Sequence, residues 1–236
     1  MNDDYCSEHN ARKCDCIGQV PLFHNATASE VNMLSEAIHS AKLPKGAFVF
    51  REGEPSEALY ILSRGVVRIA KTTEGGREQV LRFLYPGDFF GHYAALQNRQ
   101  HYASAETVSN AVVCSLRKAD FHRILERNPA LTYRFLLAVA ERLHQADEWM
   151  GSIAPMEIEQ RLARILHDFY VRRVSGDDLV RLPMAKKDLA SLLGTTPETL
   201  SRKLSLFRQK GLISTNGPGA IRILDPQRLF RLAGAE

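Results

Sequence analysis

Between residues 43 and 119, short apolar runs alternate with clusters of turn-forming residues. Glycine and proline mark the breaks, as in Glu52-Gly53-Glu54-Pro55 and Glu74-Gly75-Gly76. Many short strands joined by regular turns are typical of a small antiparallel barrel or jelly roll. The expected strands cover residues 47–50, 59–62, 66–70, 80–84 and 112–116.

A short helix is expected before this strand-rich region. Thr27 to Glu30 can form a capping box, and Val31, Leu34 and Ile38 recur at helical spacing. Residues 1–19 have no apolar periodicity and contain Cys, His, Asp and Lys. They are expected to form a tail that needs a ligand to become ordered.

A long helix is predicted to begin at Asn128-Pro129, where Asn can cap the helix and Pro suits its first turn. Apolar residues then recur every three or four positions until Pro155, which ends the helix. A narrow seam of this length favours a parallel homodimer over packing on the chain's own barrel. The seam residues are Leu136, Val139, Leu143, Ala146, Met150 and Ile153.

The C-terminal third has the pattern of a winged helix-turn-helix. Helices are expected over 157–171, 186–193 and 197–210, with a tight turn at Gly194-Thr195-Thr196. Two short apolar runs flank residues 216–219. From Met156 onward there are 14 Lys and Arg against 9 Asp and Glu, whereas the whole chain carries a net charge of +4. The basic excess is thus C-terminal, which favours a nucleic-acid partner.

The last of these helices carries the side chains expected to read DNA. Thr196 can cap it, and its first turns place Glu198, Ser201 and Arg202 on one side. A carboxylate can accept from cytosine, a guanidinium can bind guanine at two atoms, and a serine can contact a base edge or a phosphate. The alternative for Glu198 and Arg202 is a surface ion pair. The residues expected at phosphates are Lys203, Arg208 and Lys210.

Three motifs resemble those of the Crp/Fnr family of bacterial transcription regulators: LYILSRG at 59–65, PGDFFG at 86–91 and LGTTPETLSR at 193–202. The resemblance covers nearly the whole chain and implies an α+β fold. An N-terminal cyclic-nucleotide-binding-like β-barrel (a jelly roll) would be followed by a long dimerisation helix and a C-terminal winged helix-turn-helix. The expected boundaries are 1–19 for the tail, 20–127 for the sensory barrel, 128–155 for the helix and 156–236 for the DNA-binding domain.

The resemblance also implies partners. In the FNR branch of the family, a triad like Glu198, Ser201 and Arg202 reads TTGAT half-sites. We therefore expect a homodimer on near-palindromic double-stranded DNA, with RNA polymerase contacted through the hairpin at residues 73–78. The sequence has no apolar run long enough to span a membrane, and its polar, acidic start is unlike a secretory signal. A cytoplasmic regulator is expected.

The barrel is not expected to bind cyclic AMP. The branch that binds it carries a Glu after the Gly-Asp-Phe-x-Gly motif and an Arg-Ser pair for the cyclic phosphate. Here the matching stretches are Gly91-His92-Tyr93-Ala94-Ala95 and His101-Tyr102-Ala103. A buried phosphate without a cationic partner would be costly.

The four cysteines point to a different signal. Cys6, Cys14 and Cys16 lie in the tail and Cys114 in the last barrel strand. In a reducing cytosol such clustering indicates metal or redox chemistry more often than structural disulfides, and the alternative is inert thiols in a frayed tail. The resemblance to the FNR branch implies a [4Fe-4S] cluster on all four thiolates that senses oxygen or nitric oxide. The tail spacing is C-x7-C-x-C, whereas that branch has C-x2-C-x5-C.

Because of this spacing, other sensory groups remain as alternatives to the cluster: a thiol-disulfide switch, a zinc site, or haem in the barrel. His9 is an alternative cluster ligand. A redox enzyme or electron carrier is a remote alternative, since the sequence has no Ser-His-Asp, Walker or dinucleotide-binding motif. We expect a regulator and not an enzyme.

Overall fold

The computed structural model describes residues 17–18, 20, 23, 26–74, 76, 78–153, 156–171, 179–182, 184–215, 217 and 219–234, without the side chains of 148–150, 152, 153, 179 and 181. Chain contacts divide the protein into two compact units, Met1–His144 and Gln145–Glu236. The division falls inside one long helix, and each unit is described by itself. None of the helices in the described ranges has the length and apolar content needed to cross a membrane.

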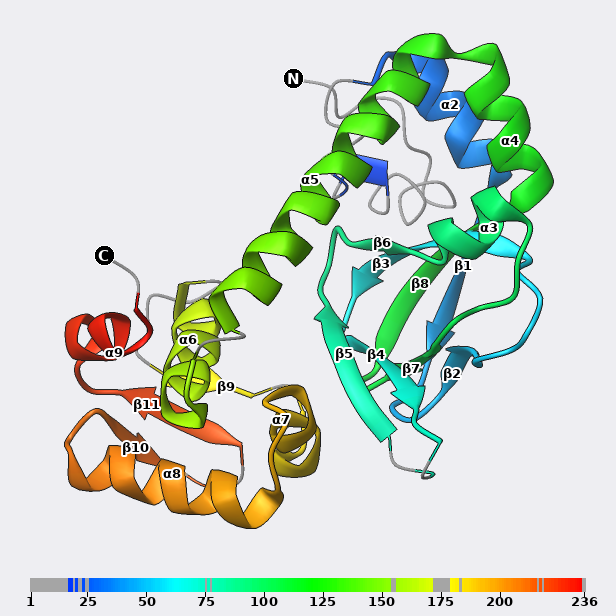
Figure 1. Cartoon of the computed structure of the whole chain (residues 1–236). Coiled ribbons are helices and arrows are strands. Elements are labelled where there is room, and N and C mark those ends of the chain that lie inside the picture. The colour runs from blue at the N-terminus through cyan, green and yellow to red at the C-terminus, as the bar shows by residue number, and fades with distance from the viewer. Residues whose placement is uncertain are drawn as a thin grey trace. The chain divides into compact units, whose positions relative to one another are not determined.

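The first unit contains two four-stranded antiparallel sheets (Figure 1). Their strand orders are β1-β8-β3-β6 and β2-β7-β4-β5. The elements are α2 (Ala28–Ala37), β1 (Ile38–Leu43), β2 (Phe48–Phe50), β3 (Ala58–Arg64), β4 (Val67–Thr72), β5 (Glu78–Leu84), β6 (Phe89–Phe90), α3 (His92–Gln97), β7 (Ser104–Thr107), β8 (Ala111–Arg117), α4 (Lys118–Arg127) and α5 (Pro129–Ile153). The predicted jelly-roll barrel is confirmed.

The sheet containing β8 is buried on both faces because successive side chains of a strand point to opposite sides. Val113 belongs to the core between the two sheets. Cys114 and Leu116 belong to a second core, on the outer face, which also includes Ile17 and residues of α2, α4 and α5. Figure 1 shows α2 and α4 against this sheet.

The structure corrects the first predicted helix. Its capping box is present, since Glu30 N donates to Thr27 Oγ1 and Thr27 N donates to Glu30 Oε2. The helix, however, ends at Ala37, and Ile38 starts β1, where it pairs with Leu116. Pairing with β8 buries Ile38 completely, so a distant strand outweighs the local helical spacing. Strands β1, β6 and β7 and helices α3 and α4 were not predicted.

Two glycines of the recognised motifs are required by backbone geometry. Gly65 and Gly91 have φ of 88° and 77°. A Cβ atom on Gly65 would lie 2.5 Å from the carbonyl oxygen of Asn110, and one on Gly91 would lie 2.9 Å from the ring of Tyr60. Side chains at these positions would force the strands apart.

Helix α5 begins as predicted. The side chain of Asn128 caps it by accepting a hydrogen bond from Leu131 N at 2.9 Å. Asn128 Nδ2 and Arg134 Nη2 both donate to Glu30 Oε1, each at 2.8 Å. The buried Glu30 carboxylate therefore joins the N-terminus of α2 to the start of α5.

The second unit is a winged helix-turn-helix with one three-stranded antiparallel sheet of order β10-β11-β9. It contains the end of α5, then α6 (Ile158–Val171), β9 (Leu179–Arg181), α7 (Lys186–Leu192), α8 (Pro197–Gln209), β10 (Ile213–Thr215), β11 (Ala220–Ile223) and α9 (Pro226–Leu232). The predicted helix-turn-helix and hairpin are confirmed. Helix α9, capped by Asp225, was not predicted.

Candidate nucleic-acid interface and sensory site

The turn between α7 and α8 is held by α6. Gly194 has a φ of 68°, which favours glycine. Arg161 Nη1 donates to the carbonyl of Leu193 at 3.3 Å, and its Nε donates to that of Met156 at 3.0 Å. Arg161 therefore fixes where α8 begins.

Helix α8 buries one face and exposes the residues predicted to read bases. Thr196 Oγ1 accepts from Thr199 N at 3.3 Å, which caps the helix. The buried side is formed by Leu200, Leu204 and Phe207. Glu198, Ser201 and Arg202 are all exposed, so they are available to a ligand.

The surroundings of the Glu198 side chain favour its ionised form. Hydrogen bonds with its own backbone N–H and then with Thr196, together with the charge of Arg202, lower the pKa of Glu198. The carboxylate is thus ionised at neutral pH and can accept a hydrogen bond from a base amino group.

An open groove of about 540 Å³ runs along this face of α8. Ser205, Leu206 and Gln209 line it in addition to predicted residues. None of the three was predicted from the sequence. The signal for the two polar ones is their spacing, since Ser205 is three residues from Arg202 and Gln209 is four from Ser205. The complete lining is Ser201, Arg202, Lys203, Ser205, Leu206 and Gln209.

The predicted phosphate-contacting cations have partners within the chain. Lys203 Nζ and Lys210 Nζ both donate to the carboxylate of Glu159 on α6, at 3.1 Å and 2.6 Å. These hydrogen bonds, with Lys210 first, lower the pKa of Glu159 despite the opposing effect of burial. Arg208 is exposed and donates to Ser205 Oγ at 3.1 Å.

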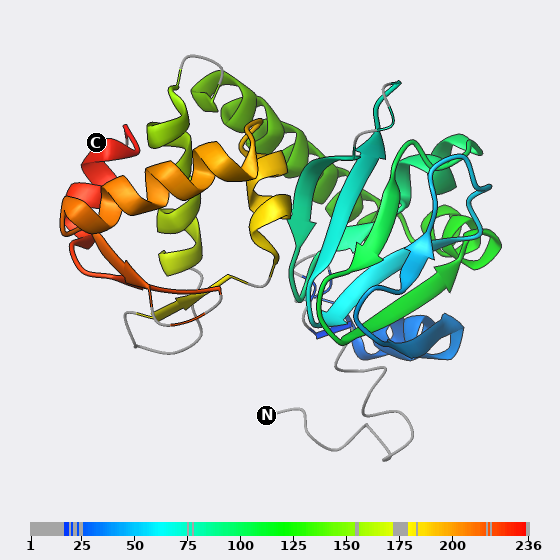
Figure 2. The ribbon, with the colours of Figure 1, turned by 90° about the horizontal axis from the view of Figure 1, so that it is seen from below.

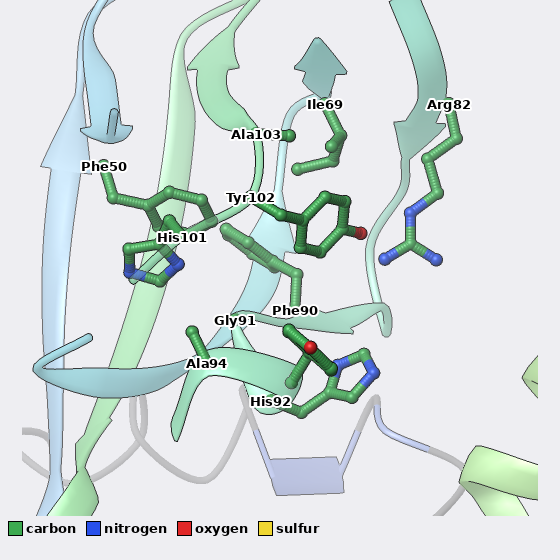
Figure 3. Close-up of a pocket in the computed structure, with 11 residues that line it drawn as sticks. Phe50, Ile69, Arg82, Phe90, Gly91, His92, Ala94, His101, Tyr102 and Ala103 are labelled. Atoms are coloured by element: carbon green, nitrogen blue, oxygen red, sulfur yellow. The ribbon is translucent and has the colours of Figure 1, made fainter. Parts of the chain in front are cut away.

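Figure 3 shows side chains that line a small cavity in the barrel. The cavity beside Gly91 and Ala103 has a volume of about 20 Å³, enough for about one water molecule. The His101 ring stacks on Phe50 with centroids 3.6 Å apart. The stacked rings thus belong to the lining of this cavity, together with residues of the 91–95 and 101–103 stretches.

A second histidine, the half-buried His92, also borders this cavity. His92 Nδ1 is buried and has no hydrogen-bond partner among the described residues. Burial, followed by the positive charges of Arg142 and Arg82, lowers the pKa of His92 to about 4. His92 is therefore neutral at physiological pH.

Cys114 is fully buried, with 0% of its surface exposed, and is disulfide-bonded. It shares the outer core with Ile17, the residue that follows Cys16 in the chain. Cys6, Cys14, Cys16 and His9 lie outside the described residues. Among those described, no three His, Cys, Asp or Glu side chains gather closely enough to hold a metal ion.

Helix α5 carries an exposed apolar face. Leu136 and Leu143 of the predicted seam are 61% and 63% exposed, and Tyr133 and Leu137 beside them are also exposed. Val139 is half-buried against the outer core. Ala146 is exposed, and the side chains of Met150 and Ile153 lie outside those described.

Both units of the chain are similar to known protein domains. Residues 40–128 match the cyclic nucleotide-binding domain and residues 160–232 match the Crp-like helix-turn-helix domain. The chain is 32% identical to the nitrogen fixation regulation protein FixK of Bradyrhizobium diazoefficiens, over 99% of this chain and 96% of the relative. It is 29% identical to the cyclic AMP receptor protein of Thermus thermophilus, over 90% of this chain and 96% of the relative.

A solved structure has the same fold. FixK2 from Bradyrhizobium japonicum superimposes with a TM-score of 0.76 at 26% identity, covering 84% of this chain and 98% of that one. Two domain matches in the expected order and a relative of nearly equal length agree with the motifs in the barrel and in α8. The chain belongs to the Crp/Fnr family of DNA-binding transcription regulators.

Proposed function

We propose that this regulator acts as a homodimer, senses oxygen, nitric oxide or redox state through its cysteines, and binds TTGAT-like palindromes. The observation that carries the sensory part is the position of Cys114, which is buried in the outer core together with Ile17, the residue that follows Cys16 in the chain. The other cysteines of the chain are Cys6, Cys14 and Cys16.

A [4Fe-4S] cluster requires four thiolates, and the chain's cysteines supply that number. Cys6, Cys14, Cys16 and Cys114 would hold the cluster. When bound, it would supply a redox-active centre on the outer face of the sheet that contains β8. The apolar residues around Cys114 would keep water from the sulfur that they surround.

A thiol-disulfide switch is the second candidate, and the disulfide bond of Cys114 favours it over the cluster. Two thiols would transfer two electrons and two protons to a small-molecule disulfide, which becomes two thiols, while the protein sulfurs bond to each other. Either sensor ties the tail to β8. The outer core that contains Cys114 and Ile17 also contains Leu131 and Phe135 of α5, so a change at the tail reaches the long helix through packed side chains.

The filled barrel supports an effector other than cyclic AMP. A cavity of about 20 Å³ cannot accept a nucleotide unless the stacked His101 and Phe50 rings separate.

The exposed face of α5 fits a second copy of the chain. Single exposed leucines are common on monomers, but a contiguous group of exposed apolar side chains such as Tyr133, Leu136 and Leu137 is typical of an interaction site. Two copies joined along α5 would present two α8 helices to the two halves of a palindrome. RNA polymerase would be contacted through the hairpin at residues 73–78.

The decisive experiment is anaerobic purification followed by absorption spectroscopy and iron and sulfide analysis. About four irons and four sulfides per chain, with DNA binding lost in air, would support the cluster. Iron-free protein that loses DNA binding on oxidation and regains it with a thiol reductant would support the disulfide switch. DNA binding that is indifferent to both oxygen and thiol reductant would overturn redox sensing altogether.

A further inference from the structure

One carboxylate of the DNA-binding unit forms ion pairs with two lysines, Lys203 in α8 and Lys210 directly after its last residue. Lys203 and Lys210 are about two helical turns apart and so lie on the same side of the helix. Both donate to Glu159 of α6, Lys203 to Oε2 at 3.1 Å and Lys210 to Oε1 at 2.6 Å. Figure 2 shows α8 crossing α6, and this ion-pair triad joins the two helices.

The triad is partly shielded from water. The Glu159 side chain is 17% exposed, and those of Lys203 and Lys210 are 30% and 40% exposed. Screening by solvent is weaker for such groups than for fully exposed ones. The lowered pKa of Glu159 keeps its negative charge present at neutral pH.

The triad also adjoins the proposed DNA surface. Lys203 lines the groove on α8 together with Ser201 and Arg202. Lysines in such a position would ordinarily bind phosphates, and each phosphate neutralised adds about 0.9 to the magnitude of the salt slope of binding. Here both ammonium groups already form ion pairs with the Glu159 carboxylate in the absence of DNA.

We propose that Glu159 competes with DNA phosphates for Lys203 and Lys210 and thereby limits sequence-independent binding. The inference rests on the proposed use of α8 as the DNA surface. Arg202 and Glu198 are outside the triad, so base reading is left intact. A larger share of the affinity for a specific site then comes from base contacts, because phosphate contacts strengthen binding to every sequence alike.

The test compares Glu159→Gln with Glu157→Gln in the full-length protein. Glu157 is exposed and lies two residues earlier, so its substitution removes the same charge at almost the same place. Binding to a random-sequence duplex is measured over a series of salt concentrations. Relative to Glu157→Gln, we expect Glu159→Gln to bind roughly three- to tenfold tighter and to steepen the salt slope by about one to two. Adding Lys203→Gln and Lys210→Gln to Glu159→Gln should abolish the gain.

Equal behaviour of the two glutamine variants, or weaker binding by Glu159→Gln, would overturn the proposal. If Glu159→Gln does not fold, Lys203→Gln with Lys210→Gln in the otherwise unchanged chain decides the question. The salt slope should then flatten by less than one, whereas flattening by about two would show that both lysines already bind phosphates freely. Failure of the α8 surface itself is distinguished by Arg202→Ala, which would then leave binding to a TTGAT palindrome unchanged.

Discussion

The guanidinium carbon of Arg142 in α5 lies 4.0 Å from the centre of the Phe89 ring in the barrel. Arg142 Nη2 also donates to Asp88 Oδ1 at 2.9 Å, and Nη1 donates to the Phe89 carbonyl. Burial lowers the pKa of Arg142 to about 10 against the opposing effect of Asp88, so the side chain stays charged at neutral pH. One side chain thus joins the long helix to the Pro86–Gly91 turn of the barrel.

Replacing Arg142 with Gln should lower the free energy of unfolding of the barrel unit by about 2 kcal/mol, because hydrogen bonds to a charged group and a cation–π contact are lost. Urea unfolding monitored by circular dichroism measures the change. Arg127→Gln, at an exposed position of α4, is the matched control and should change the free energy by less than about 0.5 kcal/mol. Equal effects of the two substitutions would show that the contacts of Arg142 contribute nothing of their own.

Arg202→Ala should lose about 1 to 3 kcal/mol of binding free energy at a TTGAT palindrome and relax the preference at the guanine that it contacts. Fluorescence anisotropy with specific, guanine-substituted and random duplexes measures both effects. Arg208→Ala, expected to remove a phosphate contact, should weaken binding to all three duplexes alike. If Arg202→Ala weakens specific and random binding equally, Arg202 contacts only phosphates.

Leu143→Lys should convert the dimer to monomers, because the two-fold axis would bring like charges together and desolvate them. Leu143 is 63% exposed within one chain, so the substitution should not disturb the fold of the monomer. Sedimentation velocity measures the outcome. Gln145→Lys adds the same charge to an exposed position on the opposite side of the helix and should remain dimeric. A dimeric Leu143→Lys variant would place the interface elsewhere.

Cys114→Ser should abolish the redox response in either sensory mechanism, and the two mechanisms differ in what else is lost. With a cluster, visible absorption, iron and anaerobic DNA binding disappear together, because a hydroxyl is a poorer iron ligand than a thiolate. With a disulfide switch, the variant contains no iron, as in the parent protein, and binds DNA in one fixed state under all conditions. An iron-replete Cys114→Ser variant with a normal oxygen response would remove Cys114 from the sensor.

Acid should destabilise the barrel through His92. Its pKa is about 4 in the folded protein and about 6.5 in an unfolded chain, so the unfolded state binds more protons between these values. The contribution of neutral His92 to the free energy of unfolding is therefore fully present above pH 6.5. The free energy of unfolding falls by roughly 3 kcal/mol as the pH decreases to 4. Urea unfolding across this range should show a smaller fall for His92→Gln. His39→Gln, at an exposed position, should behave like the unchanged chain.

The sequence by itself determined the architecture and the family. Alternating short runs, a capping box at Thr27, the Asn128-Pro129 helix start and the Gly194 turn are local signals, and each depends on residues within about four positions. The jelly-roll barrel, the winged helix-turn-helix and the assignment to a family of regulators and not enzymes are confirmed. The base-reading, cluster and seam residues stay predictions.

The tertiary structure decided what depends on distant partners. Ile38 continues the helical spacing of α2, yet pairing with Leu116 in β8 makes it a strand residue. Cys114 and Val113 are neighbours in β8 and lie in the cores on opposite faces of its sheet. Only the packing of helices and Ile17 on the outer face brings Cys114 into the same core as Ile17. Lys203 and Lys210 have the pattern of phosphate contacts, but α6 brings Glu159 to both. Strand pairing and ion pairs join residues that are far apart in the chain, so the local periodicity of the sequence does not predict them.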